Sequence, residues 1–354
     1  MATSSVLPIT VQQDGPGHPS GKLWLRIFFP GFIVISLLLI ITLRTLPFYG
    51  DMTRLGLLSE TAFGWHVQPP HVEPRYLQAA PVSEADVMVI GDSFSMSNRW
   101  QSLLVRSGYK VSTTFFGQYK EELCRDFDGW LDRAGFQGKL VIIESVERLL
   151  NDRLKNGETC EAMSRPLSAG LKPFFPPLDE VPPPALNWDG KLLSGVQIFS
   201  NTRSALKSTE PWLSNKKVLV RSVPDGCALF SHQACTKLPL WPDDDANGEL
   251  TPHNVAQMKA FTDAHPRRKL LWMVIPNKTT VYIKPENSKD FVADLVKQDL
   301  GPDLFSFGLA QKTQMRDFFF PNDTHISMQG QLALGQRMLE AVRKIFPPPP
   351  LKSS

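Results

Sequence analysis

The chain of 354 residues lacks several patterns that would assign it to a functional class at once. It holds four cysteines but no C-x-x-C pair, which argues against a zinc ribbon or a thioredoxin motif. No run of Lys and Arg is interleaved with aromatic residues, and 38 basic side chains nearly balance 35 acidic ones. A nucleic-acid partner is therefore not indicated. Internal repeats are also absent, and nothing in the sequence calls for a metal or a cofactor.

The most acidic stretch, Asp243-Asp244-Asp245, does not form an EF-hand. It lacks the ordered ligand spacing and the closing Glu of such a calcium loop. We expect a solvated turn there.

The four cysteines leave two interpretations open. An even number fits two disulfides in an oxidising compartment, where Cys227 and Cys235 would close a short loop and Cys124 and Cys160 a longer one. The alternative is four reduced, partly buried thiols. The cysteines alone do not choose between the two, but the apolar segment near the N-terminus favours the oxidising compartment.

That segment is an uncharged run from Ile27 to Leu43, bracketed by Arg26 and Arg44. It is at the short end for a membrane-spanning helix, but apolar neighbours extend it to residues 23–46 and arginines can snorkel. No small-residue cleavage site follows, so we predict an uncleaved anchor. The alternative is a buried core helix, which the polar and Gly/Pro/Ser-rich residues 1–20 could not cover.

The basic residues around this run give a weak orientation signal, because they lie on both sides of it. The cysteines and the long C-terminal body favour an N-terminus inside the cytoplasm and a body outside. The predicted order is a cytoplasmic tail at 1–22, an anchor at 23–46, a linker at 47–82, a folded domain at 83–346 and a Pro-rich tail at 347–354.

The body alternates between strand and helix patterns. Apolar runs predict strands at 87–90, 109–116, 140–144 and 270–275, with a shorter candidate at 218–220. Helical spacing occurs at 94–105, 121–134, 254–263 and 327–346, the last with Ser327 as N-cap. Continuous apolar strands separated by helices are typical of a parallel sheet covered on both faces. We predict an α/β fold, a three-layer α/β/α sandwich with a mostly parallel sheet, preceded by one transmembrane helix.

Residues 155–215 break this alternation and are rich in proline. We expect a long insertion over the core, and such loops commonly act as lids or binding surfaces.

Ser93 lies in Gly91-Asp92-Ser93-Phe94, where the first predicted strand turns into a helix. Ligands bind at this carboxyl edge in open α/β sheets. The start of the following helix would offer N–H groups to a developing oxyanion. Taken alone, Asp92 or Ser93 could equally be a helix cap.

Asp323-Thr324-His325 lies just before the last predicted helix. A serine hydroxyl needs a base within hydrogen-bond reach, and the base needs a carboxylate to orient it. Two residues apart in an extended segment, Asp323 and His325 would point the same way, so that the imidazole could bind the carboxylate and face Ser93. A turn residue and a surface residue are the alternative. Both motifs together favour a catalytic triad of Ser93, His325 and Asp323.

These motifs resemble the SGNH (GDSL) hydrolase superfamily, and more narrowly the alginate O-acetyltransferase-like branch that acetylates exopolysaccharides. The resemblance spans about residues 86–345. Its segments are residues 91–94, Glu144-Ser145-Val146-Glu147-Arg148, residues 274–278 leading to Val281-Tyr282, and residues 323–325. It implies an SGNH-hydrolase or flavodoxin-like sandwich, an acyl-enzyme on Ser93, and an oxyanion hole that includes the Ser93 N–H.

The sequence departs from both groups. In the alginate enzymes the D-x-H segment precedes the serine, whereas here it follows, as in ordinary SGNH hydrolases. The G-x-N-D block of those hydrolases is absent, and D-x-H replaces D-x-x-H. The oxyanion asparagine is therefore unassigned, and Gly117, after the second strand, is our candidate for a second N–H donor.

Arg148, Lys278 and Tyr282 are candidate substrate-binding residues, because the two cations could bind an acidic sugar or position an acyl donor. For Arg148 the alternative is a local pair with Glu144. Trp188 and other aromatics of the insertion could stack on sugar rings or pack structurally.

The resemblance implies an O-acyl (acetyl) transferase or esterase that acts on a polysaccharide outside the cytoplasmic membrane. It would sit in a bacterial inner membrane with its catalytic domain in the periplasm, and a membrane O-acyltransferase would supply the acyl group. The alternative is a non-catalytic glycan-binding or scaffold subunit of an exopolysaccharide export complex, for which the missing asparagine block argues. The retained Ser93, His325 and Asp323 favour the enzyme.

Overall fold

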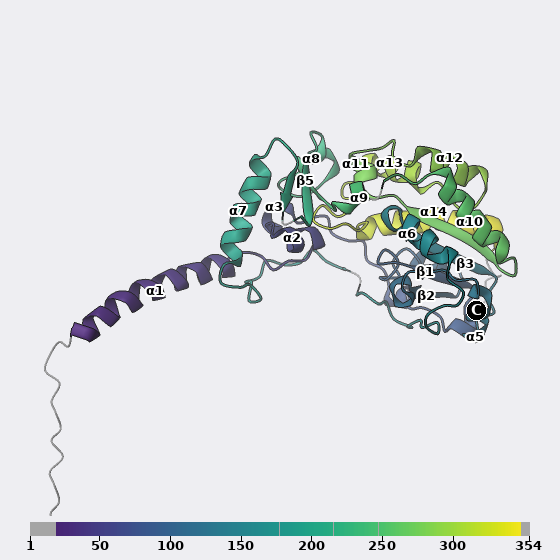
Figure 1. The fold of residues 1–354 in the computed structure, drawn as a ribbon, viewed down its shortest axis with the longest axis horizontal. Helices are drawn as coiled ribbons and strands as arrows, with labels where there is room; N and C mark the ends of the chain where they lie inside the picture. The colour runs from purple at the N-terminus through teal and green to yellow at the C-terminus, as the bar shows by residue number, and fades with distance from the viewer. Residues whose placement is uncertain (1–18, 177, 215, 247, 348–354) are drawn as a thin grey trace, which may run out of the picture.

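The computed structural model describes residues 19–176, 178–214, 216–246 and 248–347. Most of the predicted cytoplasmic tail and all but the first residue of the Pro-rich tail lie outside these ranges. The centre is a four-stranded parallel sheet in the order β2-β1-β3-β7 (Figure 1). Its strands are β1 Val87–Gly91, β2 Val111–Phe115, β3 Leu140–Val146 and β7 Lys269–Ile275. The predicted α/β class and the mostly parallel sheet are confirmed.

The strands are apolar on both faces, as in β1. Because side chains alternate along a strand, Val87 and Val89 join one apolar cluster while Met88 and Ile90 join another. The first cluster also holds side chains of α4 Ser102–Arg106, α11 Lys278–Tyr282, α13 Leu304–Gln314 and α14 Met328–Ile345. The second holds side chains of α5 Phe127–Arg133, α6 Glu147–Glu158, α10 Pro252–Ala264 and α12 Lys289–Lys297.

The N-terminal helix α1 runs from Pro19 to Leu43 and projects from the body as a rod (Figure 1). Its residues Gly21–Leu43 are long and apolar enough to cross a membrane, and nearly all of them are exposed. The predicted N-terminal apolar helix is therefore present.

Residues 47–82 differ from the irregular linker that we predicted. They contain α2 Asp51–Gly56, α3 Glu60–Phe63 and η1 Pro74–Leu77, and η2 Val82–Glu84 follows. The side chains of Met52, Leu58, Phe63 and Trp65 are buried. The segment lacks a long periodic pattern, so its composition suggested a linker, but its aromatic and aliphatic side chains pack as core.

The helix predicted at 94–105 is mostly a series of turns. Ser95 donates to the carbonyl of Asp92 at 3.0 Å and Asn98 to that of Ser95 at 3.2 Å, and only α4 is helical. Asn98 is left-handed with φ of 54°, and its side chain bonds the Leu77 carbonyl at 2.9 Å. Short polar side chains compete in this way with helical bonding, so the start of a helix does not follow Ser93 directly.

A second, antiparallel sheet contains β4 Trp212–Ser214, β5 Val218–Ser222 and β6 Lys237–Leu240. The strand predicted at 218–220 is therefore real but belongs to this smaller sheet. A disulfide between Cys227 and Cys235 closes the connection from β5 to β6, which carries α8 Gly226–Leu229.

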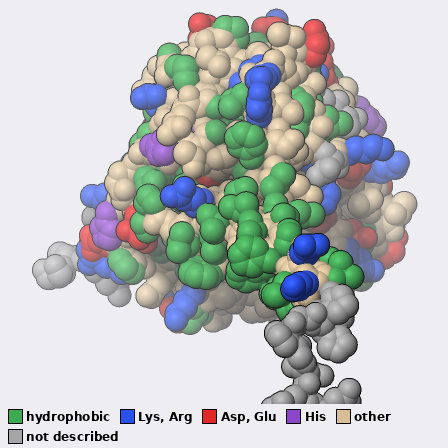
Figure 2. Space-filling model, turned by 90° about the vertical axis from the view of Figure 1, so that its left-hand side faces the viewer, with side chains coloured by type: hydrophobic (Ala, Val, Ile, Leu, Met, Phe, Trp, Pro, Cys, Tyr) green, Lys and Arg blue, Asp and Glu red, His purple; other side chains and the backbone are tan. Residues whose placement is uncertain are grey.

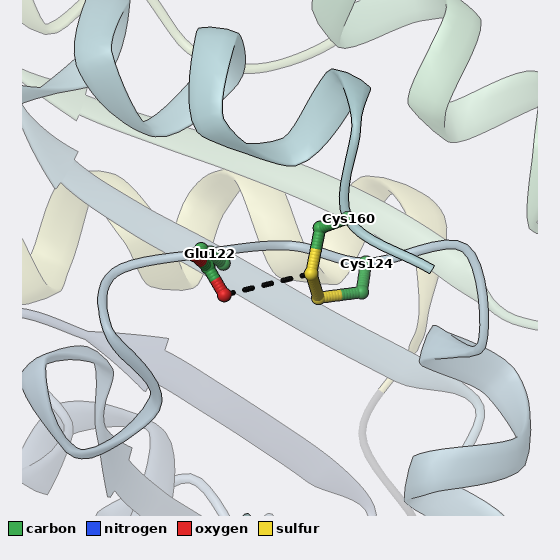
Figure 3. Close-up of side chains that lie close together, drawn as sticks. All are labelled: Glu122, Cys124 and Cys160. Atoms are coloured by element: carbon green, nitrogen blue, oxygen red, sulfur yellow. Dashed lines mark hydrogen bonds between the residues drawn. A yellow bond between two sulfur atoms is a disulfide. The ribbon is translucent and has the colours of Figure 1, made fainter. Parts of the chain in front are cut away.

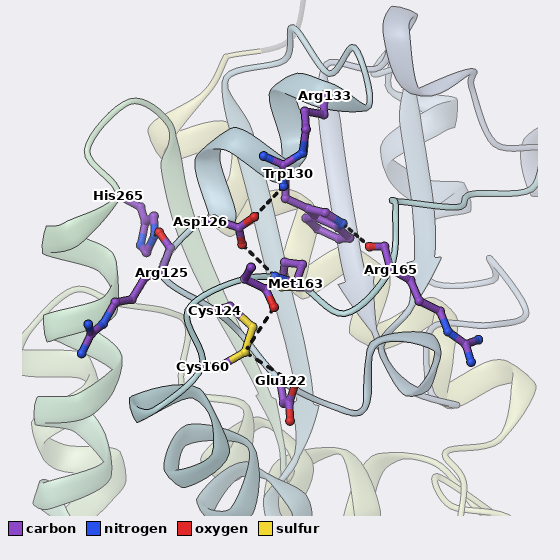
Figure 4. The surroundings of a disulfide bond; sticks show 11 residues. Glu122, Cys124, Arg125, Asp126, Trp130, Arg133, Cys160, Met163, Arg165 and His265 are labelled. Carbon is purple, nitrogen blue, oxygen red and sulfur yellow. Dashed lines mark hydrogen bonds and ion pairs between the residues drawn. A yellow bond between two sulfur atoms is a disulfide. The ribbon is translucent and has the colours of Figure 1, made fainter.

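The second disulfide joins Cys124 to Cys160, with the carboxylate of Glu122 beside it (Figure 3). It ties the start of the insertion to the segment before α5. Asp126 continues the attachment, because its carboxylate accepts the Met163 N–H at 2.8 Å (Figure 4).

The insertion then crosses the carboxyl edge of the parallel sheet. Thr114, near the end of β2, donates its hydroxyl to the Ser168 carbonyl at 2.6 Å, and the Phe175 N–H donates to the Met96 carbonyl at 3.1 Å. Farther along, the insertion forms helix α7 Ser194–Lys207. It thus borders the edge at which Ser93 lies.

Candidate active site

Four of the predicted site residues each follow a different strand of the parallel sheet. Ser93 comes after β1, Gly117 after β2, Arg148 after β3 and Lys278 after β7. Since parallel strands end on the same edge, the topology gathers these positions at one rim.

Ser93 and His325 are in hydrogen-bond contact. The Ser93 Oγ lies 2.8 Å from His325 Nε2, although 232 positions separate the two residues. Among residues 91–100, all of which the structure describes, Ser93 alone is not buried. Ser93 therefore contacts the imidazole and is partly accessible to solvent.

The turn that presents Ser93 is fixed by Asp92. One carboxylate oxygen of Asp92 accepts the Phe94 N–H at 3.0 Å, and the other accepts the Val146 N–H at 3.0 Å. The first bond forms a local Asx turn around Ser93. The second bond, from the Val146 N–H to Asp92, joins this turn to the end of β3.

Gly91 is required by a close approach. A Cβ atom added there would lie 2.5 Å from Ser95 Oγ and 2.8 Å from Glu144 Oε2. Both groups are already engaged, because the Ser95 hydroxyl donates to that same Glu144 oxygen at 2.8 Å. A larger residue at 91 would push the Ser93 turn away from β3.

The pKa values of two buried carboxyl groups under the turn, Asp92 and Glu144, are shifted in opposite directions. Burial acts to raise the pKa of Asp92, but the Arg153 guanidinium at 3.1 Å and two backbone N–H bonds outweigh it, and the pKa is lowered. Burial and the neighbouring Asp92 charge raise the pKa of Glu144 well above its ordinary value. The surroundings thus favour the charged form of Asp92 and the neutral form of Glu144.

Asp323 and His325 lie in a tight loop, not in the extended segment that we predicted. A bridge between Phe319 and Ile326 closes this loop, and we call residues 319–326 the triad loop. The Asp323 Oδ1 accepts both the ring Nδ1–H of His325, at 2.6 Å, and its backbone N–H, at 3.0 Å. An Asx-type turn thus brings the two side chains together, because a short side chain can bond a backbone N–H two residues on.

Asp323 and His325 shift each other's pKa in opposite directions. Burial works to raise the pKa of Asp323, but His325 and the N–H donors outweigh it and lower the pKa to about 2. Burial works to lower the pKa of His325, but the Asp323 carboxylate outweighs it and raises the pKa above the usual value. Asp323 is thus an anion that holds the Nδ1 proton and leaves Nε2 for Ser93.

Phe94 packs on the imidazole, and Arg148 lies near the Phe94 ring. The Phe94 ring packs on His325 with centroids 4.8 Å apart, and the Arg148 guanidinium carbon lies 6.0 Å from the Phe94 ring centre. Arg148 pairs with Asp244 at 3.2 Å, and not with Glu144 as the alternative interpretation had it. Asp244 is buried in α9 Asp243–Ala246, so the solvated turn predicted there is wrong for this residue.

A contact that sequence reasoning missed joins the segment after α1 to the triad loop. The backbone N–H of Asp51 donates to Asp323 Oδ2 at 2.9 Å, and that of Met52 donates to the Asn322 carbonyl at 3.0 Å. The Asn322 side chain donates to Glu60 Oε2 at 2.7 Å. Glu60 is itself buried, and burial raises its pKa. We call this contact, made by Asp51, Met52, Glu60 and Asn322, the N-terminal clamp.

Only the position of Asn322, next to Asp323, could have drawn attention to this clamp. The backbone N–H groups of Asp51 and Met52 cannot be recognised from the sequence. An isolated glutamate such as Glu60 is ordinarily expected at the surface.

Lys278 is buried and not accessible to a substrate, contrary to our prediction of a substrate-binding residue. It is 1% exposed, and its ammonium donates to the carbonyls of Pro239, Pro321 and Asp323 at 2.9–3.0 Å. Burial lowers its pKa to about 7. Lys278 therefore holds the triad loop from beneath.

Tyr282 is also buried, and its hydroxyl accepts the Phe319 N–H of the triad loop at 3.3 Å.

Gly117 is exposed just after the end of β2, in η3 Phe116–Tyr119. Trp188 is highly exposed in the insertion. The structure thus brings Ser93, His325 and Asp323 together and turns Tyr282 inward.

The backbone at Ser93 suits an oxyanion. Within the residues that the structure describes, the Ser93 N–H donates to no other protein group, whereas the N–H groups of Phe94 and Ser95 are engaged with Asp92. This donor lies beside the hydroxyl that would attack.

Comparison of the chain with protein-family models, with curated proteins and with solved structures gave no match. The functional conclusion therefore rests on the geometry of the residues above.

Proposed function

We propose that this protein is a membrane-anchored serine O-acyltransferase or carbohydrate esterase of the SGNH type. The observation that carries the proposal is the chain of contacts from Ser93 Oγ to His325 Nε2, at 2.8 Å, and from His325 Nδ1 to Asp323, at 2.6 Å. Side chains in this order form the nucleophile, base and orienting acid of an acyl-transfer site.

In the first half-reaction the Ser93 oxygen attacks the carbonyl carbon of an acyl ester, most simply acetyl. His325 Nε2 takes the hydroxyl proton, and the Ser93 N–H stabilises the oxyanion, with Gly117 as the proposed second donor. The carbon–oxygen bond to the leaving alcohol breaks, and His325 returns the proton to that oxygen. Ser93 is left as an acyl ester.

In the second half-reaction His325 removes a proton from a sugar hydroxyl or from water, and that oxygen attacks the Ser93 ester. The Ser93 oxygen leaves and regains the proton from His325. Transfer to sugar gives a transferase, and transfer to water gives an esterase. The outcome depends on how well the bound sugar excludes water.

For the fold we propose the three-layer α/β/α sandwich of the SGNH hydrolases, with the serine first in the chain. The parallel sheet, with apolar clusters on its two faces, supports this proposal. The position of Ser93 directly after β1 also supports it, since these enzymes carry their serine there.

For the substrate we propose a polysaccharide outside the cytoplasmic membrane of a bacterium. Two disulfides are consistent with a periplasmic body, and α1 is consistent with an inner-membrane anchor. Of the three predicted substrate-binding residues, Arg148 remains our candidate for contact with an anionic sugar, because its guanidinium lies beside the Phe94 and His325 rings.

Hydrolysis of p-nitrophenyl acetate by the full chain in detergent tests the proposal. We expect Ser93→Ala to lower kcat by at least about 10³-fold, the order of magnitude typical of triad serines. Ser97→Ala is the matched control, because this buried hydroxyl lies in the same series of turns and bonds Gln331 instead. Equal rates for the wild type and Ser93→Ala would reject the triad and leave a glycan-binding or scaffold role.

Transfer and hydrolysis are separated by adding oligosaccharide. A transferase increases the mass of the oligosaccharide by one acetyl group, whereas an esterase releases acetate alone.

A further inference from the structure

Helix α7 and the loop before it expose an apolar surface at the end of the molecule that carries α1. Trp188 is 75% exposed and Phe199 is 65% exposed. We call this surface the α7 face; it consists of Leu186, Trp188, Leu192, Leu193, Val196 and Phe199. Figure 2 shows hydrophobic side chains gathered at this end of the molecule, with Lys and Arg among them. Contiguous exposed apolar surface of this kind marks a contact with a partner or a membrane.

The helix is apolar on two sides, one buried and one exposed, which lie roughly 120° apart around its axis. Ile198 and Ala205 are buried against the body. Val196, Phe199 and Leu206 are exposed, and their spacing of three and seven residues places them on one side of the helix. The body therefore uses only one side of α7, and the other side remains apolar toward the outside.

α7 is fixed rigidly to the end of α1. The Thr42 hydroxyl accepts the Gly195 N–H at 3.1 Å and donates to the Leu192 carbonyl at 3.1 Å, and the Asn187 N–H donates to the Leu43 carbonyl at 3.1 Å. A Cβ at Gly195 would lie 2.7 Å from the Thr42 backbone. The two helices thus meet at backbone distance, and the α7 face begins where α1 ends.

This position corresponds to a membrane surface. The 23 residues Gly21–Leu43 extend about 35 Å, slightly more than the roughly 30 Å of a bilayer's hydrocarbon core. The end of α1 therefore falls at the boundary, where Trp side chains are enriched. The exposed basic residues on α7 or just before it are Lys191, Arg203 and Lys207, whereas Asp189 is an exposed acidic residue there. Such basic side chains suit anionic lipid headgroups.

We propose that the α7 face is a second membrane contact, which lies in the headgroup region of the bilayer that α1 crosses. It is continuous with α1, and this continuity favours lipid as the occupant over a separate protein. The inference goes beyond the proposed chemistry and does not depend on it.

The contact also orients the site. The Thr202 hydroxyl on α7 accepts the Ser59 N–H at 2.9 Å, and Asn201 donates to the Gly56 carbonyl at 2.9 Å. The same segment carries Asp51 of the N-terminal clamp, which bonds Asp323. A docked α7 face would thus hold the triad at a fixed height and angle above the membrane surface.

Photo-crosslinking of the full chain in vesicles of phosphatidylethanolamine and phosphatidylglycerol tests this. p-Benzoylphenylalanine replaces Phe199 in one variant, Leu193 in a second, Phe32 of α1 in a third and Val296 of α12 in a fourth. Val296 is the matched control, since it is apolar and 51% exposed, and its helix α12 lies at the other end of the body from α7 (Figure 1). Intact-mass measurement then detects lipid adducts.

We expect adducts at Phe199 and Leu193 several-fold above those at Val296, together with strong adducts at Phe32. Adducts at Phe32 with only the Val296 level at Phe199 and Leu193 would overturn the proposal. Crosslinks from Phe199 to another protein in native membranes, without lipid adducts, would overturn it in favour of a protein partner. Hydrolysis of p-nitrophenyl acetate, measured in parallel, reports on the proposed enzyme separately.

Discussion

At the scale of single residues, the charge on Asp323 sets the working state of His325. In the proposed mechanism the imidazole must be neutral to take the Ser93 proton, so we expect activity to fall as the pH drops through the pKa of His325. Asp323 raises this pKa above its usual value, against the opposing effect of burial. The acid limb of the pH profile should therefore lie above the pH 6.5 of an unperturbed histidine.

We predict that Asp323→Asn lowers kcat/KM by about 10³–10⁴-fold and moves the acid limb to lower pH. Loss of the carboxylate removes the charge that favours imidazolium, and the amide no longer holds the Nδ1 proton. The measurement is kcat/KM for p-nitrophenyl acetate between pH 5 and pH 9. Asp263→Asn, at an exposed ion pair on α10, is the control that should leave both quantities unchanged. An acid limb that stays in place would mean that Asp323 does not govern the titrating base.

Arg148 illustrates how a residue can be predicted for position but not for partner. Its place after β3 was readable, but the buried partner Asp244 lies 96 positions away, in a stretch that looked like a solvated turn. A pair between distant residues has no local spacing to reveal it.

At the scale of elements, α2 and α3 matter more than their length suggests. They supply the N-terminal clamp and bury Met52 and Phe63 beside the small sheet. Trp65, just after α3, packs on Phe320 of the triad loop with ring centroids 5.0 Å apart. The segment next to α1 is thus part of the candidate site.

We predict that Asn322→Ala lowers the free energy of unfolding by about 1–3 kcal/mol, because it leaves a buried oxygen of Glu60 without a donor. It should also lower kcat/KM several-fold, since the neighbouring Asp323 is no longer held in place. Denaturant unfolding and hydrolysis measure the two effects.

The control is Thr262→Ala, which removes a hydrogen bond to Trp272 in the apolar cluster on the other face of the sheet. It should reduce stability and leave kcat/KM unchanged. If Asn322→Ala changes stability alone, the clamp is structural and does not position the triad.

At the scale of the whole molecule, the folded body begins directly after α1 and not near residue 83. Each large apolar side chain that is buried contributes about 1.5–3 kcal/mol, and a domain is stable by only about 5–15 kcal/mol. Met52, Leu58, Phe63 and Trp65 together account for a sum of that size.

We predict that a chain beginning at residue 47 folds and hydrolyses p-nitrophenyl acetate, whereas one beginning at residue 83 does neither. The shorter chain loses both the buried side chains and the Asp51 N–H that holds Asp323. Circular dichroism on heating and the hydrolysis rate measure the outcome. A cooperative melt and full activity in the shorter chain would show that residues 47–82 are only a linker.

The sequence alone was enough to predict the helices and strands that depend on patterns among neighbouring residues. Apolar runs fixed the four parallel strands, the spacing at 327–346 gave α14 with its Ser327 cap, and the uncharged run gave α1. The positions of Ser93 and Asp323-Thr324-His325 at segment ends were readable for the same reason, because strand ends and helix starts have local signatures.

Only the tertiary structure decided which distant groups meet. It joined Ser93 to His325, placed Lys278 beneath the triad loop instead of at the opening, and brought Asp51 to Asp323. It also set α7 against the end of α1. Each of these contacts depends on backbone atoms or on partners tens to hundreds of positions apart. Such contacts arise when packing closes the chain on itself, so no short stretch of sequence carries them.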